Sequence, residues 1–85
     1  MQNLKAYVES RNAWAKIFNG AQLNLKSAAD RKKIAGMIDA DLSPENLTCD
    51  GELPAAQVRA RHASLLKVAK ELKALDPSVS IYEVN

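Results

Sequence analysis

The sequence has 85 residues, of which 47% are hydrophobic and 26% charged, and its formal net charge is +2. This length fits one domain without a second core, and this hydrophobic content excludes a disordered tail. A net charge this small does not by itself indicate a nucleic-acid-binding protein, so nucleic acid is not the expected partner.

The cysteine content and the hydropathy of the sequence indicate the cellular compartment in which the protein is expected. The single cysteine, Cys49, cannot form an intramolecular disulfide, whereas small secreted domains usually carry several. No apolar run approaches the roughly 20 residues of a membrane span, and the first ten residues lack the apolar segment of a signal peptide. We therefore expect a cytoplasmic protein, in the host cytoplasm if a phage encodes it, without a membrane partner.

The first predicted helix covers residues 3–18. Apolar side chains recur there at the spacing of one helical face, beginning with Leu4 and ending with Phe18. The Asn-Gly pair at 19–20 tolerates the left-handed conformation that ends many helices. Residues 21–25 alternate apolar and polar side chains, which is typical of a short extended stretch.

The second predicted helix covers residues 27–41. Ser27 can cap it, and Asp30 stands three positions on, as in a conservative capping box. A glycine inside a helix costs about 1 kcal/mol relative to alanine. We therefore expect Gly36 to have a purpose, namely to permit close packing of another helix.

A structured acidic loop is predicted between the second and third helices. Five acidic residues and no basic one lie between Lys33 and Arg59. Ser43-Pro44 favours a turn or one short helical turn, and Asp50-Gly51 favours a second turn. The simplest interpretation is that this acidic segment folds over the basic helices and neutralises them.

The third predicted helix covers residues 54–75, with a proline tolerated in its first turn and Asp76-Pro77 ending it. Residues 78–84 are rich in β-formers and predict an extended tail. This tail could pair with residues 21–25, lie across the helices, or pair with another copy or a partner. The predicted fold is therefore mainly α: a small three-helix domain with a structured acidic loop and a short extended C-terminal segment.

Three arginines fall within or beside the apolar faces of the predicted helices: Arg11, Arg31 and Arg61. Because an unpaired buried charge costs several kcal/mol, each guanidinium needs an anionic partner. In the simpler hypothesis, acidic side chains of the central segment supply these partners from within the chain. The candidate acidic residues are Asp41, Glu45, Asp50 and Glu52.

The alternative is that two or more arginines converge on an exposed pocket for a nucleotide or another phosphate. Tyr7 or Trp14 would then stack on a base. Against this stands the interpretation of Tyr7, Trp14 and Phe18 as core anchors, with a partner-binding patch as a further alternative.

No catalytic or metal-binding constellation is present. His62 is the only histidine, and no nucleophile or carboxylate is placed by sequence to form a triad with it. One Cys and one His are too few for a zinc site. Acidic and hydroxyl groups from Asp41 to Glu52 partly match calcium-loop spacing, but Asn46 replaces the required glycine. We expect no enzyme activity, no cofactor and no metal.

The C-terminal half carries a resemblance. The stretch Leu-Ser-Pro-Glu-Asn-Leu-Thr-Cys-Asp-Gly-Glu-Leu at 42–53 is followed by a helix with Val58, Arg59 and Arg61, then by Leu-Asp-Pro at 75–77 and Ile-Tyr-Glu at 81–83. This combination resembles small uncharacterised accessory proteins of tailed phages and prophages. The resemblance implies binding of host or defence proteins rather than catalysis, and it transfers no functional residue.

The expected function is therefore a non-enzymatic interaction module that binds a host protein, with self-association into a homo-oligomer also expected. A second hypothesis is a small-ligand binder that sequesters a nucleotide or phosphate through the arginines. A third is weak non-specific binding of nucleic acid by basic residues of the third helix, which predicts a steep salt dependence. Those residues are Arg59, Lys67, Lys70 and Lys73.

Overall fold

A computed structural model describes residues 2–84 and shows a mainly α protein, as predicted. Its helices are α1 (Gln2–Ile17), α2 (Ala28–Asp41), the one-turn α3 (Pro44–Leu47), α4 (Ala55–Leu75) and the 3-10 turn η1 (Tyr82–Val84). The ends of the three long helices lie within one residue of the positions predicted from the sequence. The short helical turn expected near residue 44 is α3.

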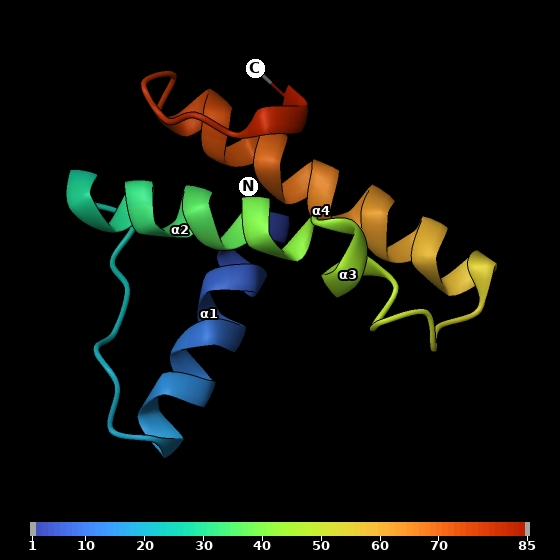
Figure 1. Ribbon diagram of the computed structural model, residues 1–85. Helices are drawn as coiled ribbons and strands as arrows, with labels where there is room; N and C mark the ends of the chain where they lie inside the picture. The colour runs from blue at the N-terminus through green and yellow to red at the C-terminus, as the bar shows by residue number, and fades with distance from the viewer. Residues whose placement is uncertain (1, 85) are drawn as a thin grey trace.

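The long helices do not run side by side along their whole lengths. Figure 1 shows α2 and α4 converging near the N-terminal end of α1, while the rest of α1 extends away from both. Accordingly, the buried residues of α1 are Leu4 and Val8, both in its first half. The core is completed by Ile34, Ala35, Ile38, Leu42, Leu47, Leu65, Val68, Ala69, Leu72, Val79 and Ile81.

Local polar contacts explain where α2 begins. The Ser27 hydroxyl accepts a hydrogen bond from the Asp30 backbone N–H at 3.3 Å, which satisfies one of the free donors of the first turn. The Asp30 carboxylate does not reach back to Ser27, as a full capping box requires. It accepts instead from the backbone N–H of Asn24, at 2.9 Å, and so ties the preceding linker to the helix.

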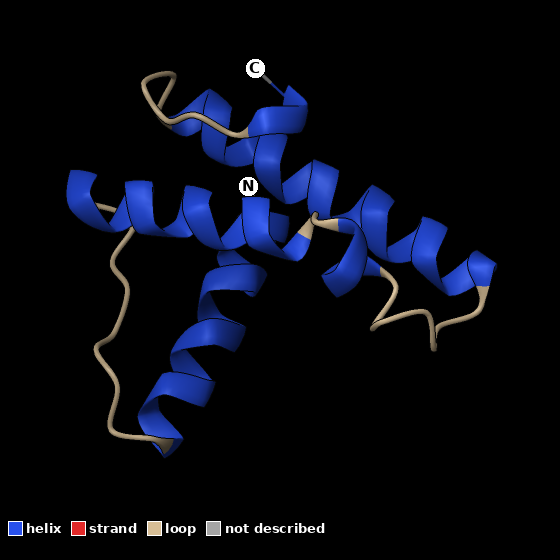
Figure 2. Cartoon of the chain, in the orientation of Figure 1, coloured by secondary structure: helices blue, strands red, loops and turns tan. Residues whose placement is uncertain are grey.

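The two predicted extended stretches are not strands, and none of residues 2–84 forms one (Figure 2). The linker at 21–25 is held by the Asn12 side chain, which accepts from the Leu23 N–H at 2.7 Å and donates to the Leu23 carbonyl at 2.9 Å. One amide side chain of α1 thus satisfies the backbone groups that a neighbouring strand would otherwise have paired.

The C-terminal tail lies across the helices, which was one of the three predicted arrangements. Val79 and Ile81 are 2% and 0% exposed, because alternate residues of an extended chain point to the same side. The Lys73 ammonium donates to the Val79 carbonyl at 2.6 Å, and the Tyr82 N–H donates to Asp39 at 2.9 Å. The tail therefore uses its β-forming residues as part of the core, not as an edge that awaits a partner.

The expectation that Gly36 permits close helix packing is wrong. Gly36 is exposed, and a Cβ built on it would meet no atom within 4 Å. Gly51, by contrast, has a φ of +86°, a left-handed conformation that disfavours any side chain.

We predict that Gly36→Ala raises the free energy of unfolding by about 0.5–1 kcal/mol. Alanine lowers the conformational entropy of the unfolded chain, and in the folded helix its methyl group would contact no neighbouring atom. Thermal denaturation followed by circular dichroism measures the change. The matched control is Gly51→Ala, the same substitution at a positive φ, which should lower the melting temperature. A fall in melting temperature for Gly36→Ala would show that this face of α2 is packed.

Candidate functional site

The first cluster of functional candidates joins α1 to the end of α2. Asp41, the last residue of α2, accepts hydrogen bonds from the Tyr7 hydroxyl at 2.6 Å and from the Arg11 guanidinium at 2.5 Å. The guanidinium carbon also lies 5.4 Å from the centre of the Tyr7 ring. Burial, followed by the hydrogen bond to Asp41, raises the pKa of Tyr7 well above its usual value. One carboxylate thus satisfies Tyr7 and Arg11 from within the chain.

Arg31 also has a carboxylate partner, but not one from the acidic loop. Its Nε donates to Asp76 at 2.7 Å, and its Nη1 donates to the Leu25 carbonyl at 2.9 Å. Asp76 is the residue that caps the C-terminal end of α4. Arg31 therefore ties the start of α2 to the end of α4 and to the linker that precedes α2.

Arg61 does not fit the prediction of an inward-facing guanidinium. It is exposed, and no ion pair or hydrogen bond of its side chain occurs within residues 2–84. Its neighbour His62 is half-buried, with Nε2 2.8 Å from a carboxylate oxygen of Glu83 in the tail. Arg61 is thus a solvated charge.

The acidic loop does not clasp the basic helices. Glu45, Asp50 and Glu52 are exposed, and their carboxylates form no ion pair within the described part of the chain. The physical reason is the one-turn helix α3, which buries Leu47 to 9% exposure and leaves the charged side chains in solvent. Of the four predicted acidic residues, only Asp41 contacts an arginine.

The arginines do not converge on one ligand. Arg11 is bound at position 41 of α2, whereas Arg31 lies ten residues earlier on the same helix. Ten helical residues span about 15 Å, which is too far for two guanidinium groups to hold one phosphate. Each of these two arginines already forms an ion pair that connects two helices.

A group of exposed apolar side chains lies at the C-terminal end of α1; we call Trp14, Ile17 and Phe18 the α1 patch. They are 61%, 70% and 72% exposed. The rings of Trp14 and Phe18 stack in parallel, with centroids 5.9 Å apart. The interpretation of Trp14 and Phe18 as core anchors is therefore wrong: both are exposed, and the buried residues of α1 are Leu4 and Val8 in its first half. The C-terminal half of α1 extends away from α2 and α4 (Figure 1). Tyr7, one turn after Leu4, packs against the core as expected.

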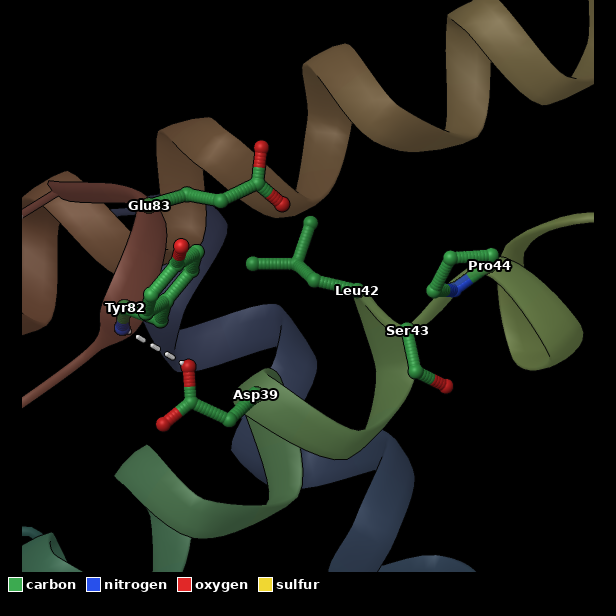
Figure 3. Close-up of a pocket in the computed structure, with 6 residues that line it drawn as sticks. All are labelled: Asp39, Leu42, Ser43, Pro44, Tyr82 and Glu83. Atoms are coloured by element: carbon green, nitrogen blue, oxygen red, sulfur yellow. Dashed lines mark hydrogen bonds between the residues drawn. The ribbon is translucent and has the colours of Figure 1, made fainter.

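A second surface feature was missed by sequence reasoning. A pocket of about 440 Å³ lies between the end of α2 and the tail (Figure 3). We call it the tail pocket; its lining residues are Asp39, Leu42, Ser43, Pro44, Tyr82 and Glu83. The one signal in the sequence was the alternation at 79–82, which turns Tyr82 outward once Val79 and Ile81 point inward.

Other candidate chemistry is not assembled. Within residues 2–84, no three or more His, Cys, Asp or Glu side chains gather as metal ligands would. Cys49 is exposed in the loop after α3, with a φ of +49°. Among the described helices, none has both the length and the apolar character needed to cross a bilayer.

No protein-family model matches the sequence, and searches of curated proteins and of solved structures found no match either.

We predict that Tyr7→Phe lowers the free energy of unfolding by about 1–2 kcal/mol, because the lost hydrogen bond is to a charged group at a partly buried site. In a domain of this size, 1 kcal/mol corresponds to a melting-temperature change of roughly 4–8 °C. Tyr82→Phe is the matched control: its ring is 88% exposed, so the same substitution should change the melting temperature little. Equal effects of the two variants would contradict the assigned contact.

The pH dependence of stability follows from Asp76. Hydrogen bonds from Ser78, then the one from Arg31, lower the pKa of Asp76 from 3.8 to about 2. Since the folded-state pKa is below that of the unfolded chain, this stabilisation is present above about pH 4 and is lost as the pH falls towards 2. Urea denaturation between these pH values should therefore show a smaller acid loss for Asp76→Asn than for the wild type. Asp50→Asn, at an exposed carboxylate, should keep the wild-type slope.

Proposed function

We propose that this chain is a non-enzymatic protein-binding module that docks onto its partner through the α1 patch. The observation that carries the proposal is the exposure of Trp14 and Phe18 on the part of α1 that projects beyond the core. Tryptophan is among the side chains that most often dominate the energy of protein interfaces. Contiguous exposed apolar groups of this kind mark interaction sites in monomeric proteins.

The spacing of the patch favours insertion of α1 into a groove. Positions 14, 17 and 18 are related as i, i+3 and i+4, the spacing with which helices present anchors to an apolar groove. One charge near the patch, the Arg11 guanidinium, is already paired with Asp41, whereas Lys16 in the last turn of α1 is exposed. The partner surface that fits is thus an apolar groove that does not need an acidic residue opposite Arg11.

A groove in a different protein fits better than a second copy of α1. Stable interfaces bury about 800 Å² on each partner, and a fully buried aromatic side chain contributes about 150–250 Å². Two convex α1 helices in contact along a line would bury little beyond the three patch residues. A groove also covers the flanks of the helix and so reaches the required area with the same anchors.

The resemblance of the C-terminal half to accessory proteins of tailed phages and prophages supports a host or defence protein as the partner. It also supports the host cytoplasm as the place of action. The phosphate-binding hypothesis has no observation in its favour, since Arg11 and Arg31 are engaged in contacts between helices. Of the residues in the nucleic-acid hypothesis, Lys73 donates to the Val79 carbonyl, and the exposed Arg59, Lys67 and Lys70 are what an ordinary solvated helix face also shows.

The test is retention of partner proteins from host lysate by immobilised variants. Trp14→Ala/Phe18→Ala should lose the partner that the wild type retains, with a melting temperature close to that of the wild type because both side chains lie outside the core. Leu75→Ala is the matched control, since it removes another exposed apolar side chain, 43% exposed, at the end of α4. It should retain the partner.

Two outcomes contradict the proposal. One is retention of the same proteins by the wild type and by the double variant. The other is a wild-type dimer in sedimentation analysis that the double variant converts to a monomer, which would assign the α1 patch to a second copy of the chain.

A further inference from the structure

We infer that the tail pocket is a second docking site, and that its occupant is a basic side chain, Arg or Lys, from a partner segment that also carries an apolar residue. The inference does not depend on the α1 patch. It uses different residues, contributed by the end of α2, the start of α3 and the tail.

The floor and one wall of the tail pocket are apolar. Leu42 directly follows α2, and Pro44 is the first residue of α3. The Tyr82 ring lies on the opposite side of the pocket, and Figure 3 shows Leu42 and Tyr82 bordering the same hollow. The Tyr82 ring is 88% exposed, so a ring face is free to be covered. An aromatic face attracts a guanidinium or ammonium group within about 6 Å of its centre. The apolar stem of Arg or Lys suits the remaining wall.

The charges of the tail pocket select a cation. Asp39 and Glu83 both line it, and no Lys or Arg does. Asp39 uses Oδ1 to accept from the Tyr82 N–H, and Glu83 uses Oε1 in its contact with His62. Within residues 2–84, the second oxygen of each carboxylate accepts no hydrogen bond. The pocket also lies at the C-terminal end of α2, where the helix dipole is negative.

These charges exclude the other simple occupants. An anion would be repelled by two carboxylates and by the negative end of α2. A purely apolar segment would cover Leu42 and Tyr82, but it would also take both carboxylates out of water without compensating hydrogen bonds. A cation with an apolar neighbour meets both requirements.

The tail pocket is formed before any partner binds. Ile81, immediately before Tyr82, is fully buried, and the Tyr82 N–H is held by Asp39 at 2.9 Å. Glu83 is in turn held by His62 of α4 at 2.8 Å. Because these contacts fix the backbone on both sides of the ring, binding need not order the tail, which lowers the entropic cost of association.

The test is a titration of the isotope-labelled protein with the peptide acetyl-Leu-Arg-Leu-Arg-amide, followed by amide chemical shifts in NMR spectra. We expect shifts concentrated at the residues that line the tail pocket, and binding that weakens with salt. The peptide acetyl-Leu-Glu-Leu-Glu-amide should cause none of them. Asp39→Asn/Glu83→Gln keeps both internal hydrogen-bond acceptors and should bind the basic peptide roughly fivefold more weakly. Tyr82→Ala should bind it roughly threefold more weakly.

The matched control is Glu45→Gln/Asp50→Asn, which removes the same charge from exposed carboxylates outside the tail pocket. It should bind the basic peptide like the wild type; a loss equal to that of Asp39→Asn/Glu83→Gln would overturn the inference in favour of bulk attraction. So would shifts that spread over all helices. Trp14→Ala/Phe18→Ala should bind the peptide normally, so a failure of the tail pocket is distinguishable from a failure of the α1 patch.

Discussion

One carboxylate, that of Asp41 at the end of α2, links two helices that otherwise barely touch, because α1 and α2 each pack mainly on α4. It accepts hydrogen bonds from Tyr7 and Arg11, residues that lie on successive turns of α1. This contact joins the end of α2 to the first half of α1, whose buried residues Leu4 and Val8 belong to the common core and which packs mainly on α4. Because the contact ends near residue 11, the following turns of α1 have no helix to pack on. The same end of α2 also forms one wall of the tail pocket, so both proposed docking surfaces are positioned from this joint.

The sequence predicted the helices well because their signals are local. Periodic apolar residues, the Ser27 cap and the prolines at 44 and 54 each act within a few residues of themselves. The need of the arginines for anionic partners was also predictable, and it was met at Arg11 and Arg31. Asp41 was among the candidate carboxylates, whereas Asp76 was not, and the individual pairs were not assigned, because Arg11 and Asp41 are 30 residues apart and Arg31 and Asp76 are 45 apart. Pairings over such separations are decided by the packing of the helices.

A partner-binding patch that includes Trp14 and Phe18 was only the alternative interpretation of the sequence, and the tail pocket was missed, for related reasons. The apolar face of residues 3–18 is continuous in the sequence, and this pattern favours Trp14 and Phe18 as core residues together with Leu4. Only the arrangement of the helices in space shows that the buried part of α1 ends at Val8. In the tail, alternating β-formers suggested a strand. The burial of Val79 and Ile81 satisfied that pattern without one and left Tyr82 facing solvent. In the α1 patch and in the tail pocket alike, an apolar side chain outside the core is available to contact a partner.

The most direct test of this account is the accessibility of Trp14, the single tryptophan of the chain. Acrylamide quenching of its fluorescence needs no partner and no variant. With the side chain 61% exposed, quenching in the native protein should approach that of the urea-unfolded chain, and dilution should not change it. Strong protection of Trp14 in the native, dilute protein would contradict the account. It would mean that the second half of α1 is packed inside the molecule and presents no patch to a partner.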